Sequence, residues 1–196
     1  KGVWPSEGSV SDAMLRVVAE RGFSWLATDE EILGRSLQIG FARDGHGAVQ
    51  DARALYRPYR VGPESADLRC GFRDHALSDL IGFTYASWDP EVAAEDFVRR
   101  LRTAGETYTR QTGGEEATVF VILDGENAWE HYREQGRPFL RALYRRLSDD
   151  PALTTVTMSE ACAVQATRLP SIFPGSWING DFYVWIGHRD DHRAWS

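Results

Sequence analysis

The sequence has little positive charge and only one lysine, Lys1. Its 196 residues contain 22 Lys and Arg against 29 Asp and Glu, which gives a net charge of −7. A protein that binds nucleic acid through its phosphates needs a basic face. Membrane association would require polybasic segments or a long apolar run, and neither is present. We therefore expect neither a nucleic acid nor a membrane as a partner.

Cysteine is also scarce. Cys70 and Cys162 lie far apart in the sequence, and neither belongs to a CxxC pair. This usage does not fit the disulfide framework of a small secreted protein. The simplest interpretation is two free, buried thiols in a reducing compartment, and no signal peptide is recognisable. The sequence therefore predicts a cytoplasmic protein.

Tryptophan, in contrast, is abundant, with seven residues in the chain. A large aromatic ring gains much of its stabilisation from burial, so some of the seven are expected to fill the core. Others are candidates for the lining of a binding site.

Short apolar runs alternate with helical patterns along the chain. Ser9 and Asp12 fit a capping box, Asp89-Pro90 marks a strong helix start, and Gly113 marks the end of that helix. A long loop or insertion is expected over residues 40–66, which are rich in Gly, Pro and Arg. Further helices are expected near residues 10–18, from about residue 76, and near residues 139–147. Strands are expected at residues 23–28, 68–72, 117–123 and 154–157.

Acidic residues follow the predicted strands. Glu7, Asp29, Asp74 and Asp124 each stand at a strand exit. In a β/α barrel the active site lies at the carboxyl ends of the strands, where such side chains meet. The repeated βα order indicates a parallel sheet, open or closed into a barrel. About four βα units are visible and a full barrel takes about 250 residues, so part of the barrel is expected to be missing from this chain.

Two segments carry the candidate catalytic carboxylates. The first is Trp4-Pro5-Ser6-Glu7-Gly8-Ser9, and the second is the run from Leu123 to His131 around Asp124. Each acid has a simpler explanation, because carboxylates are also favoured at helix N-termini. Together, however, two carboxylates suit glycoside hydrolysis, in which one attacks the anomeric carbon and the other protonates the leaving oxygen.

Four segments resemble conserved regions of the family-57 glycoside hydrolases. WPSEGSVS resembles the third region, and ILDGENAWEHY resembles the fourth, in the form found in amylopullulanase-like members. FRDHALSDLIGF resembles a stretch between them, and SWINGDFYVWIGHRDDHRAW resembles the fifth region. The family's first two regions, with their His-rich strand, have no counterpart here.

The resemblance implies a retaining hydrolase or transglycosylase that acts on α-glucans without cofactor or metal. Its fold would be α/β, a partial (β/α)7-type barrel with parallel strands over residues 1–168. A helical or irregular segment, residues 169–196, would pack on the site. Glu7 would be the nucleophile and Asp124 the acid/base. An upstream segment of the same enzyme, or another copy, would complete the barrel. The oligo- or polysaccharide substrate would contact Trp4, Arg73, Asp74, His75, Glu126, Trp129, Asp181 and Trp185.

Two other interpretations remain open at this stage. The chain could be a half-barrel that binds carbohydrate, or supports a structure, without catalysis. A metal-dependent polysaccharide deacetylase is a weaker alternative, suggested by Asp74-His75 together with His131 or His188. Their spacing matches no firm metal-ligand pattern, and a hydrogen-bonded structural histidine is the commoner explanation.

Overall fold

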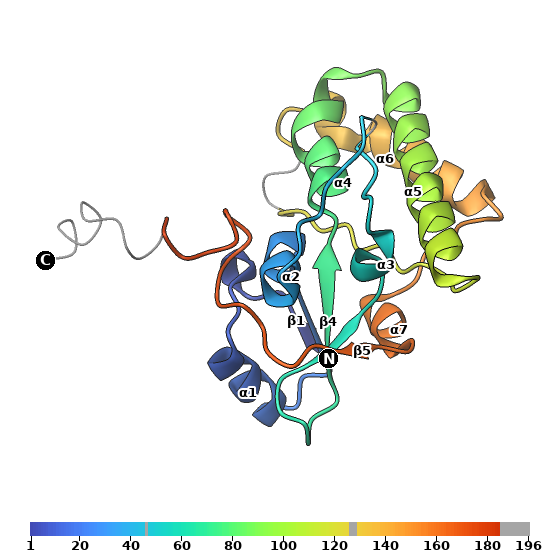
Figure 1. Cartoon of the computed structure of the whole chain (residues 1–196). Helices are drawn as coiled ribbons and strands as arrows, with labels where there is room; N and C mark the ends of the chain where they lie inside the picture. Colours follow the sequence, from blue (N-terminus) through green and yellow to red (C-terminus); the bar gives the residue numbers. More distant parts are fainter. Residues whose placement is uncertain (46, 126–128, 185–196) are drawn as a thin grey trace, which may run out of the picture. The chain divides into compact units, whose positions relative to one another are not determined.

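The computed structural model describes residues 1–45, 47–125 and 129–184, and the chain divides into two compact units (Figure 1). Each unit is assembled from segments that are distant in sequence. Unit 1 is made of Lys1–Phe41, Arg57–Phe72 and Met158–Ser196, and unit 2 is made of Ala42–Tyr56 and Arg73–Thr157.

Unit 1 contains an open sheet. Its strands are β1 (Gly2–Val3), β2 (Trp25–Asp29), β3 (Tyr59–Val61), β4 (Leu68–Arg73) and β5 (Thr167–Arg168). They lie in the order β1-β2-β4-β3-β5, so β1 and β5 form the edges. Strand β1 is parallel to β2, β3 is parallel to β5, and β3 is antiparallel to β4. The α/β fold with a mostly parallel sheet is therefore confirmed, whereas the sequence did not predict the antiparallel β3.

Strand β1 is short and depends on a glycine. Gly2 pairs with Trp25 in the register of β1 and β2. A Cβ atom on Gly2 would lie 2.0 Å from the indole ring of Trp25, which no real contact allows. The absence of a side chain at Gly2 lets the Trp25 ring lie across the start of the sheet.

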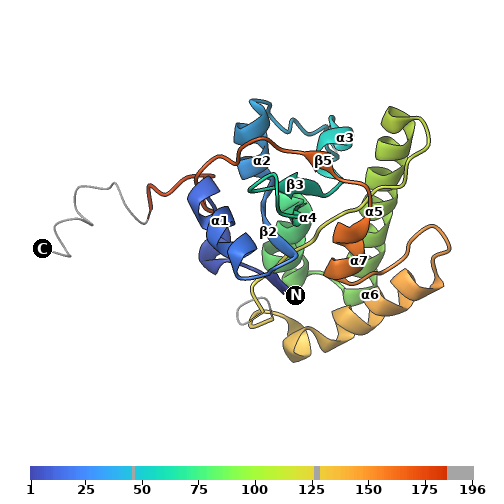
Figure 2. The same ribbon diagram turned by 90° about the horizontal axis from the view of Figure 1, so that it is seen from below.

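Helices α1 (Asp12–Glu20), α2 (Glu30–Leu37) and α7 (Met158–Ala163) belong to unit 1 (Figure 2). The cap of α1 is Ser11, whose Oγ accepts a hydrogen bond from the Met14 amide at 3.2 Å. The predicted capping box at Ser9 is wrong, because Ser9 lies in the preceding turn. Buried apolar side chains of this unit come from helices and strands alike, including Leu15, Leu26, Ile32, Leu33, Leu68 and Phe72.

The two cysteines lie in unit 1, Cys70 on β4 and Cys162 on α7. Both are buried and free, as the sequence predicted. Burial raises the pKa of the Cys70 thiol well above its usual range, and the nearby Cys162 adds to this effect. Burial also raises the pKa of Cys162 to about 11. Both thiols are therefore protonated near neutral pH, the form that reacts slowly.

Unit 2 is mainly helical. Its α-helices are α3 (Ala52–Leu55), α4 (His75–Asp79), α5 (Pro90–Thr112) and α6 (Arg137–Asp149). Helix α4 continues into a π-helical turn, η2 (Leu80–Thr84), and a 3-10 turn, η3 (Tyr85–Ser87), and a second 3-10 turn, η4 (Arg133–Gly136), precedes α6. The predicted boundaries of α5 are confirmed, with Asp89 as N-cap, Pro90 in the first turn and Gly113 in the left-handed conformation at φ 76°.

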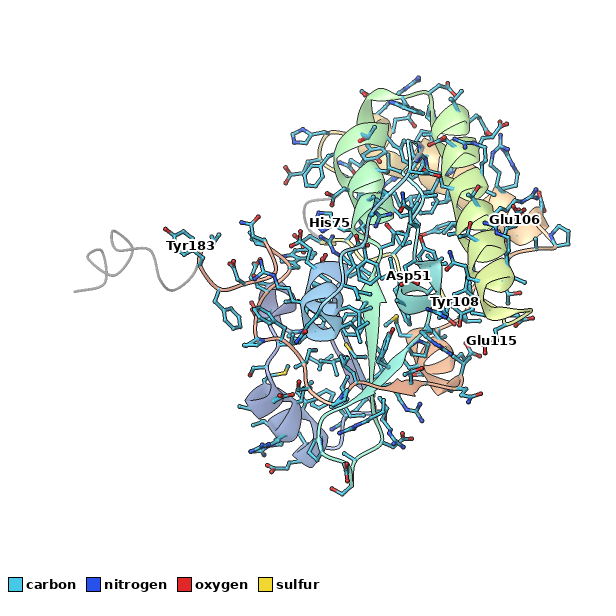
Figure 3. All side chains as sticks on the ribbon, in the orientation of Figure 1. Asp51, His75, Glu106, Tyr108, Glu115 and Tyr183 are labelled. Atoms are coloured by element: carbon cyan, nitrogen blue, oxygen red, sulfur yellow. The ribbon has the colours of Figure 1, made fainter. Side chains whose placement is uncertain are left out.

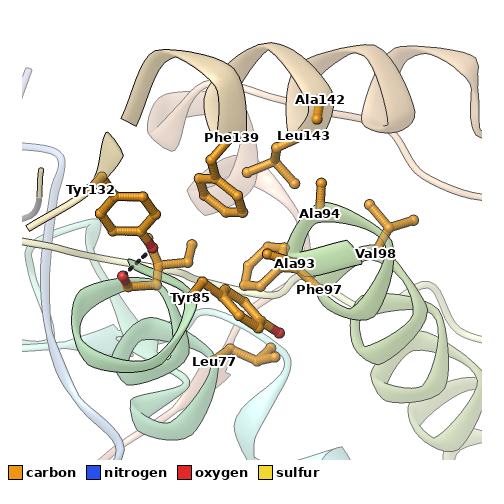
Figure 4. Close-up of a cluster of buried hydrophobic side chains, with 11 residues drawn as sticks. Leu77, Tyr85, Ala93, Ala94, Phe97, Val98, Tyr132, Phe139, Ala142 and Leu143 are labelled. Carbon is orange, nitrogen blue, oxygen red and sulfur yellow. Dashed lines mark hydrogen bonds between the residues drawn. The ribbon is translucent and has the colours of Figure 1, made fainter. Parts of the chain in front are cut away.

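The core of unit 2 lies between α5, α6 and the turns after α4 (Figure 4). Aromatic rings dominate it, and the Tyr132 hydroxyl donates a hydrogen bond to the Ile81 carbonyl, which satisfies both polar groups inside the apolar cluster. The cluster consists of Leu77, Ile81, Tyr85, Ala93, Ala94, Phe97, Val98, Tyr132, Phe139, Ala142 and Leu143.

The apolar run at residues 117–123 does not form the regular strand that its composition predicts. It shares one parallel bridge with β4, between Arg73 and Phe120, and the Asp74 amide donates to the Phe120 carbonyl at 2.8 Å. Other backbone groups bond outside a ladder, because the Thr118 amide donates to the Tyr56 carbonyl and the Ile122 amide to the Ser78 hydroxyl. Residues 154–157, also predicted as a strand, are likewise outside any strand.

None of the helices in the described part of the chain is both long and apolar enough to cross a membrane.

The N-cap of α5 provides a first test. Asp89 Oδ1 accepts from the amides of Glu91 and Val92 at 2.9 and 3.2 Å. We expect Asp89→Ala to lower the free energy of unfolding by about 1 kcal/mol, the usual value of such a cap, in urea titrations followed by circular dichroism. Glu106→Ala, on the exposed face of the same helix (Figure 3), is the control and should change stability much less. Equal effects of the two substitutions would contradict the capping role.

Candidate active site

Glu7 lies in a tight turn beyond the end of β1. The turn is a 3-10 element, η1 (Ser6–Gly8), in which Glu7 has φ 54° and ψ 27° and Gly8 has φ 57°. Residues other than glycine rarely adopt this left-handed backbone conformation, and those held in it cluster at functional sites. The Thr28 hydroxyl donates to the Gly8 carbonyl at 2.6 Å, which ties the turn to β2.

A segment near the carboxyl end of the described chain holds this turn in place. Val10 and Gly175 exchange two backbone hydrogen bonds, of 2.8 and 3.1 Å. Two residues further on, the Trp177 amide donates to the Glu7 carbonyl at 3.0 Å. The Trp177 indole Nε1 donates to Glu7 Oε2 at 2.9 Å. The backbone and the carboxylate of Glu7 are thus both fixed by one residue that is 170 positions away in the sequence.

Trp4 completes this part of the site. Its ring meets the Trp177 ring edge to face, with centroids 5.0 Å apart and planes at 66°. Gly8 lies against both rings, since a Cβ atom there would be 3.1 Å from the Trp4 ring and 3.2 Å from Trp177 Cβ. Trp4 and Glu7 are both partly exposed. Two indoles and a carboxylate therefore converge within unit 1, and an apolar ring next to a carboxylate is suited to a sugar.

Asp181, a predicted sugar contact, lies in the turn that follows Trp177. Its Oδ1 accepts from the Tyr183 amide at 2.9 Å, and its carbonyl accepts from the Ser176 hydroxyl at 2.8 Å. Arg35 of α2 lies 3.7 Å from its other carboxylate oxygen. The Asp181 side chain thus helps to order this turn, and its contact with sugar remains a prediction.

Asp74 of unit 2 is at the end of β4 and is only 1% exposed. It caps α4, since Oδ1 accepts from the Leu77 amide at 2.9 Å. The Tyr56 hydroxyl donates to Oδ2 at 2.7 Å, and Arg43 lies 3.0 Å from Oδ1. With both oxygens engaged by protein donors, Asp74 connects α4 to the segment around residues 43–56. A direct bond to a sugar would require one of these donors to be displaced.

Arg73 and His75 flank Asp74 in the sequence, and their side chains lie next to each other. The Arg73 guanidinium lies 3.4 Å from the Ile122 carbonyl and 3.4 Å from His75 Nδ1. His75 Nε2 lies 3.0 Å from the Asp79 carboxylate, one helical turn onward. Arg73 is almost fully buried, whereas His75 is partly exposed and lies where β4 passes into α4 (Figure 3).

Asp124 follows the extended run and lies in unit 2. Four residues before it, Phe120 is bridged in parallel to Arg73, the last residue of β4. Asp124 is partly exposed. Glu7 belongs to unit 1, and the predicted meeting of Glu7 and Asp124 in one cleft stays a prediction.

Trp129 is half-buried against the aromatic core of unit 2. Its ring lies 5.4 Å from Tyr132 and 6.4 Å from Phe139, centroid to centroid. Gly136, at φ 76°, leaves room for it, because a Cβ atom there would lie 2.6 Å from the indole. Two further predicted contacts, Glu126 and Trp185, lie outside the described residues.

Trp177 is the site residue that sequence reasoning missed. The segment SWINGDFYVWIGHRDDHRAW contains two Trp-Ile pairs, at Trp177 and Trp185, and the family resemblance implies a sugar contact only for the second. The local signal was present as Trp177-Ile178-Asn179-Gly180, a Trp followed by a turn sequence. Only the pairing of residues 175–177 with residues 7–10 distinguishes Trp177 from the other tryptophans.

Within residues 1–45, 47–125 and 129–184, no group of three or more His, Cys, Asp or Glu side chains is arranged to hold a metal ion. His131 is exposed, and His188 lies outside these ranges.

Comparison with protein families gives one match. Residues 1–171 match the model described as glycosyl hydrolase family 57. The match covers both Glu7 and Asp124, and it ends before Trp177 and Asp181. A comparison with curated proteins finds no significant match.

Several solved structures have a similar fold. An alpha-amylase, AmyC, from Thermotoga maritima has a TM-score of 0.67 and 15% identity, with 90% of this chain and 43% of that chain covered. A 4-alpha-glucanotransferase from Thermococcus litoralis has a TM-score of 0.60 and 17% identity, with 91% and 25% covered. A family-57 branching enzyme from Thermococcus kodakaraensis, in complex with glucose, has a TM-score of 0.73 and 14% identity, with 100% and 45% covered.

These similarities confirm the predicted fold class, an α/β structure of the partial (β/α)7-barrel type. The chain spans less than half the length of each of the three solved structures.

The close packing of Gly175 gives a test of the Glu7 turn. A Cβ atom on Gly175 would lie 2.5 Å from the Gly180 carbonyl oxygen and 2.7 Å from Ile32 Cδ1. We expect Gly175→Ala to lower the free energy of unfolding by about 1–3 kcal/mol, the usual cost of overpacking. Gly40→Ala is the matched control, because no atom beyond the two neighbouring residues lies within 4 Å of the added methyl group. Urea titration of the two variants measures the difference, and similar midpoints would show that the segment has room to move.

Proposed function

We propose, from the premise that this chain belongs to glycosyl hydrolase family 57, that it forms part of a retaining enzyme acting on α-glucans. The observation that carries the proposal is the state of Glu7. It is partly exposed, held in a left-handed turn beyond a parallel strand, and fixed by Trp177 beside the Trp4 ring.

In the proposed first step, a Glu7 carboxylate oxygen attacks the anomeric carbon of the glucan. The new C–O bond forms as the glycosidic C–O bond breaks, and Asp124 donates its proton to the departing sugar oxygen. The product is a glycosyl ester on Glu7. A rigid carboxylate is suited to this task, because attack requires a fixed geometry of the reacting atoms.

In the second step, Asp124 accepts a proton from water or from an acceptor sugar hydroxyl. The resulting oxygen nucleophile attacks the anomeric carbon, and Glu7 leaves as a carboxylate. Two inversions give overall retention of the anomeric configuration. Water as acceptor makes the enzyme a hydrolase, and a sugar hydroxyl makes it a transglycosylase.

The sugar would lie against the indoles and the polar groups at the strand ends. Trp4 and Trp129 are each only partly buried, which supports their proposed use as apolar platforms. His75 is the most accessible of the three polar residues at the end of β4. Arg73, which lies 3.4 Å from His75 Nδ1, would hold the imidazole ring, and Asp74 would hold the N-terminus of α4. We also propose that the sugar contacts Glu126, Asp181 and Trp185, because these residues lie in the segments that resemble family-57 motifs.

The position of β1 at an edge of the sheet supports a second part of the proposal. Strand β1 stands at an edge of the sheet, and an uncovered parallel edge exposes unpaired backbone groups. We propose that an upstream segment of the enzyme, or another copy, pairs beside β1. The segment from residue 169 onward would serve as the part that packs on the site, as the contacts of Trp177 with Glu7 support. A cytoplasmic location remains our proposal.

The roles of the two acids can be separated by the leaving group. In the complete enzyme, Glu7→Gln should lose roughly 10⁴-fold or more in activity on every substrate. Asp124→Asn should lose roughly 10²- to 10⁴-fold on natural glucans, but much less in the first step on a glycosyl fluoride, because fluoride leaves without a proton. Initial rates on amylose and on α-glucosyl fluoride measure both.

Azide provides a control for the nucleophile. Added to Glu7→Gly, it should attack the vacated face and give a glycosyl azide of inverted configuration, detectable by NMR. The role assignment is wrong if the two mutants respond alike to leaving-group ability, or if the wild-type enzyme inverts the anomeric centre. A folded, sugar-binding protein without turnover in any form would favour the non-catalytic half-barrel.

The completion of the barrel can be tested by reconstitution. We expect residues 1–196 alone to have little activity on amylose, and co-expression with the upstream part of the enzyme to restore it. The reason is that part of the sugar site would come from the added strands. Glu7→Gln in the reconstituted protein is the control that assigns the activity to this site. Full activity of the chain as a monomer would refute the requirement.

A further inference from the structure

The Glu7 carboxylate has an asymmetric environment. Among the described residues, its one hydrogen-bond donor is the Trp177 indole Nε1, which lies 2.9 Å from Oε2. The same residue fixes the Glu7 carbonyl through its backbone amide at 3.0 Å. The two oxygens of the carboxylate therefore differ, because Oε2 accepts the N–H and Oε1 accepts no bond from the described part of the chain.

Several neighbouring contacts hold the hydrogen bond between Trp177 and Glu7 in place. Gly175, two residues before Trp177, is paired with Val10 through two backbone hydrogen bonds, and there is no space for a methyl group at Gly175. The Trp4 ring meets the Trp177 ring edge to face. The indole can thus neither rotate nor move away without disturbing the turn, and the N–H stays directed at Oε2.

We propose that Trp177 is a positioning residue that selects Oε1 of Glu7 as the attacking oxygen and assists the departure of Glu7 in the second step. This inference rests on the proposed role of Glu7 as nucleophile. It assigns a function to a residue outside the region matched by the family model.

The strength of the hydrogen bond from Trp177 depends on the charge on Oε2. A hydrogen bond to a charged oxygen is roughly twice as strong as one to a neutral oxygen. When Oε1 attacks, the carboxylate charge is lost, Oε2 becomes the ester carbonyl oxygen, and the bond from Trp177 weakens. When the ester bond between Oε1 and the anomeric carbon breaks, the electron pair returns to the carboxylate, and the bond strengthens. The indole N–H therefore favours the second step over the first.

Removing the N–H should consequently change the balance of the two steps. In Trp177→Phe, with α-glucosyl fluoride as substrate, we expect the second step to slow by about tenfold, while the first step is unchanged or faster. Stopped-flow release of fluoride should then show a burst followed by a slower steady state. Mass spectrometry of quenched enzyme should show more glucosyl ester on Glu7 than in the wild type. The complete enzyme is used for all measurements.

Two comparisons separate this effect from a loss of structure. Trp25→Phe is the matched control, since the Trp25 indole also donates one hydrogen bond, to Ser159 Oγ at 3.1 Å, and we expect no change in the balance of steps. If Trp177→Phe fails to fold, benzothienylalanine at position 177 keeps the shape of the indole and lacks only the N–H. It should give the same burst.

The outcomes distinguish the two proposals. If wild-type Glu7 forms the glucosyl ester and Trp177 variants slow both steps equally, or neither step, the inference on Trp177 is overturned and the proposed function stands. If no ester forms on Glu7 in the wild type or in the variants, Glu7 is not the nucleophile and both proposals are overturned.

Discussion

The pairing of residues 175–177 with residues 7–10 is the constraint on which the Glu7 region depends. It joins the first turn after β1 to a segment near the other end of the described chain through backbone bonds and one indole bond. A left-handed Glu7 would be strained in isolation, because its side chain crowds the backbone at positive φ. Here the neighbouring bonds over-determine the turn, so the strain is retained and the carboxylate is held still.

Acids at strand exits have two different roles in this molecule. Asp29 and Asp74 each accept a hydrogen bond from an amide of the helix that follows, and both are buried. A helix begins directly after each of these strands, and its N-terminus favours a carboxylate. Glu7 is different, since its side chain is partly exposed and bonds to an indole instead of a helix amide. A carboxylate at a strand exit therefore does not by itself indicate catalysis, and its partner decides the interpretation.

The strands show where local amino-acid composition does not predict the secondary structure. Residues 117–123 have the β-branched character of a buried strand, yet their amides bond to the Tyr56 carbonyl and the Ser78 hydroxyl, and a single bridge joins them to β4. Tyr59–Val61 lies in a stretch that reads as a loop, yet it pairs with two strands. Strand formation requires a neighbour in register, which composition does not supply.

The sequence by itself determined the α/β class, the boundaries of α5, the two free thiols and the motifs around Glu7 and Asp124. These features depend on local signals, such as Asp89 with Pro90 at a helix start and Gly113 at its end. Only the tertiary structure decided the antiparallel β3, the burial of Asp74 among Tyr56 and Arg43, and the pairing of Trp177 with Glu7. The contact of Trp177 with Glu7 spans 170 positions, and those of Asp74 with Tyr56 and Arg43 span 18 and 31, and no local pattern specifies which distant group will meet which. Strands β3 and β4 are closer in sequence, but their pairing requires two strands in register, which composition does not supply.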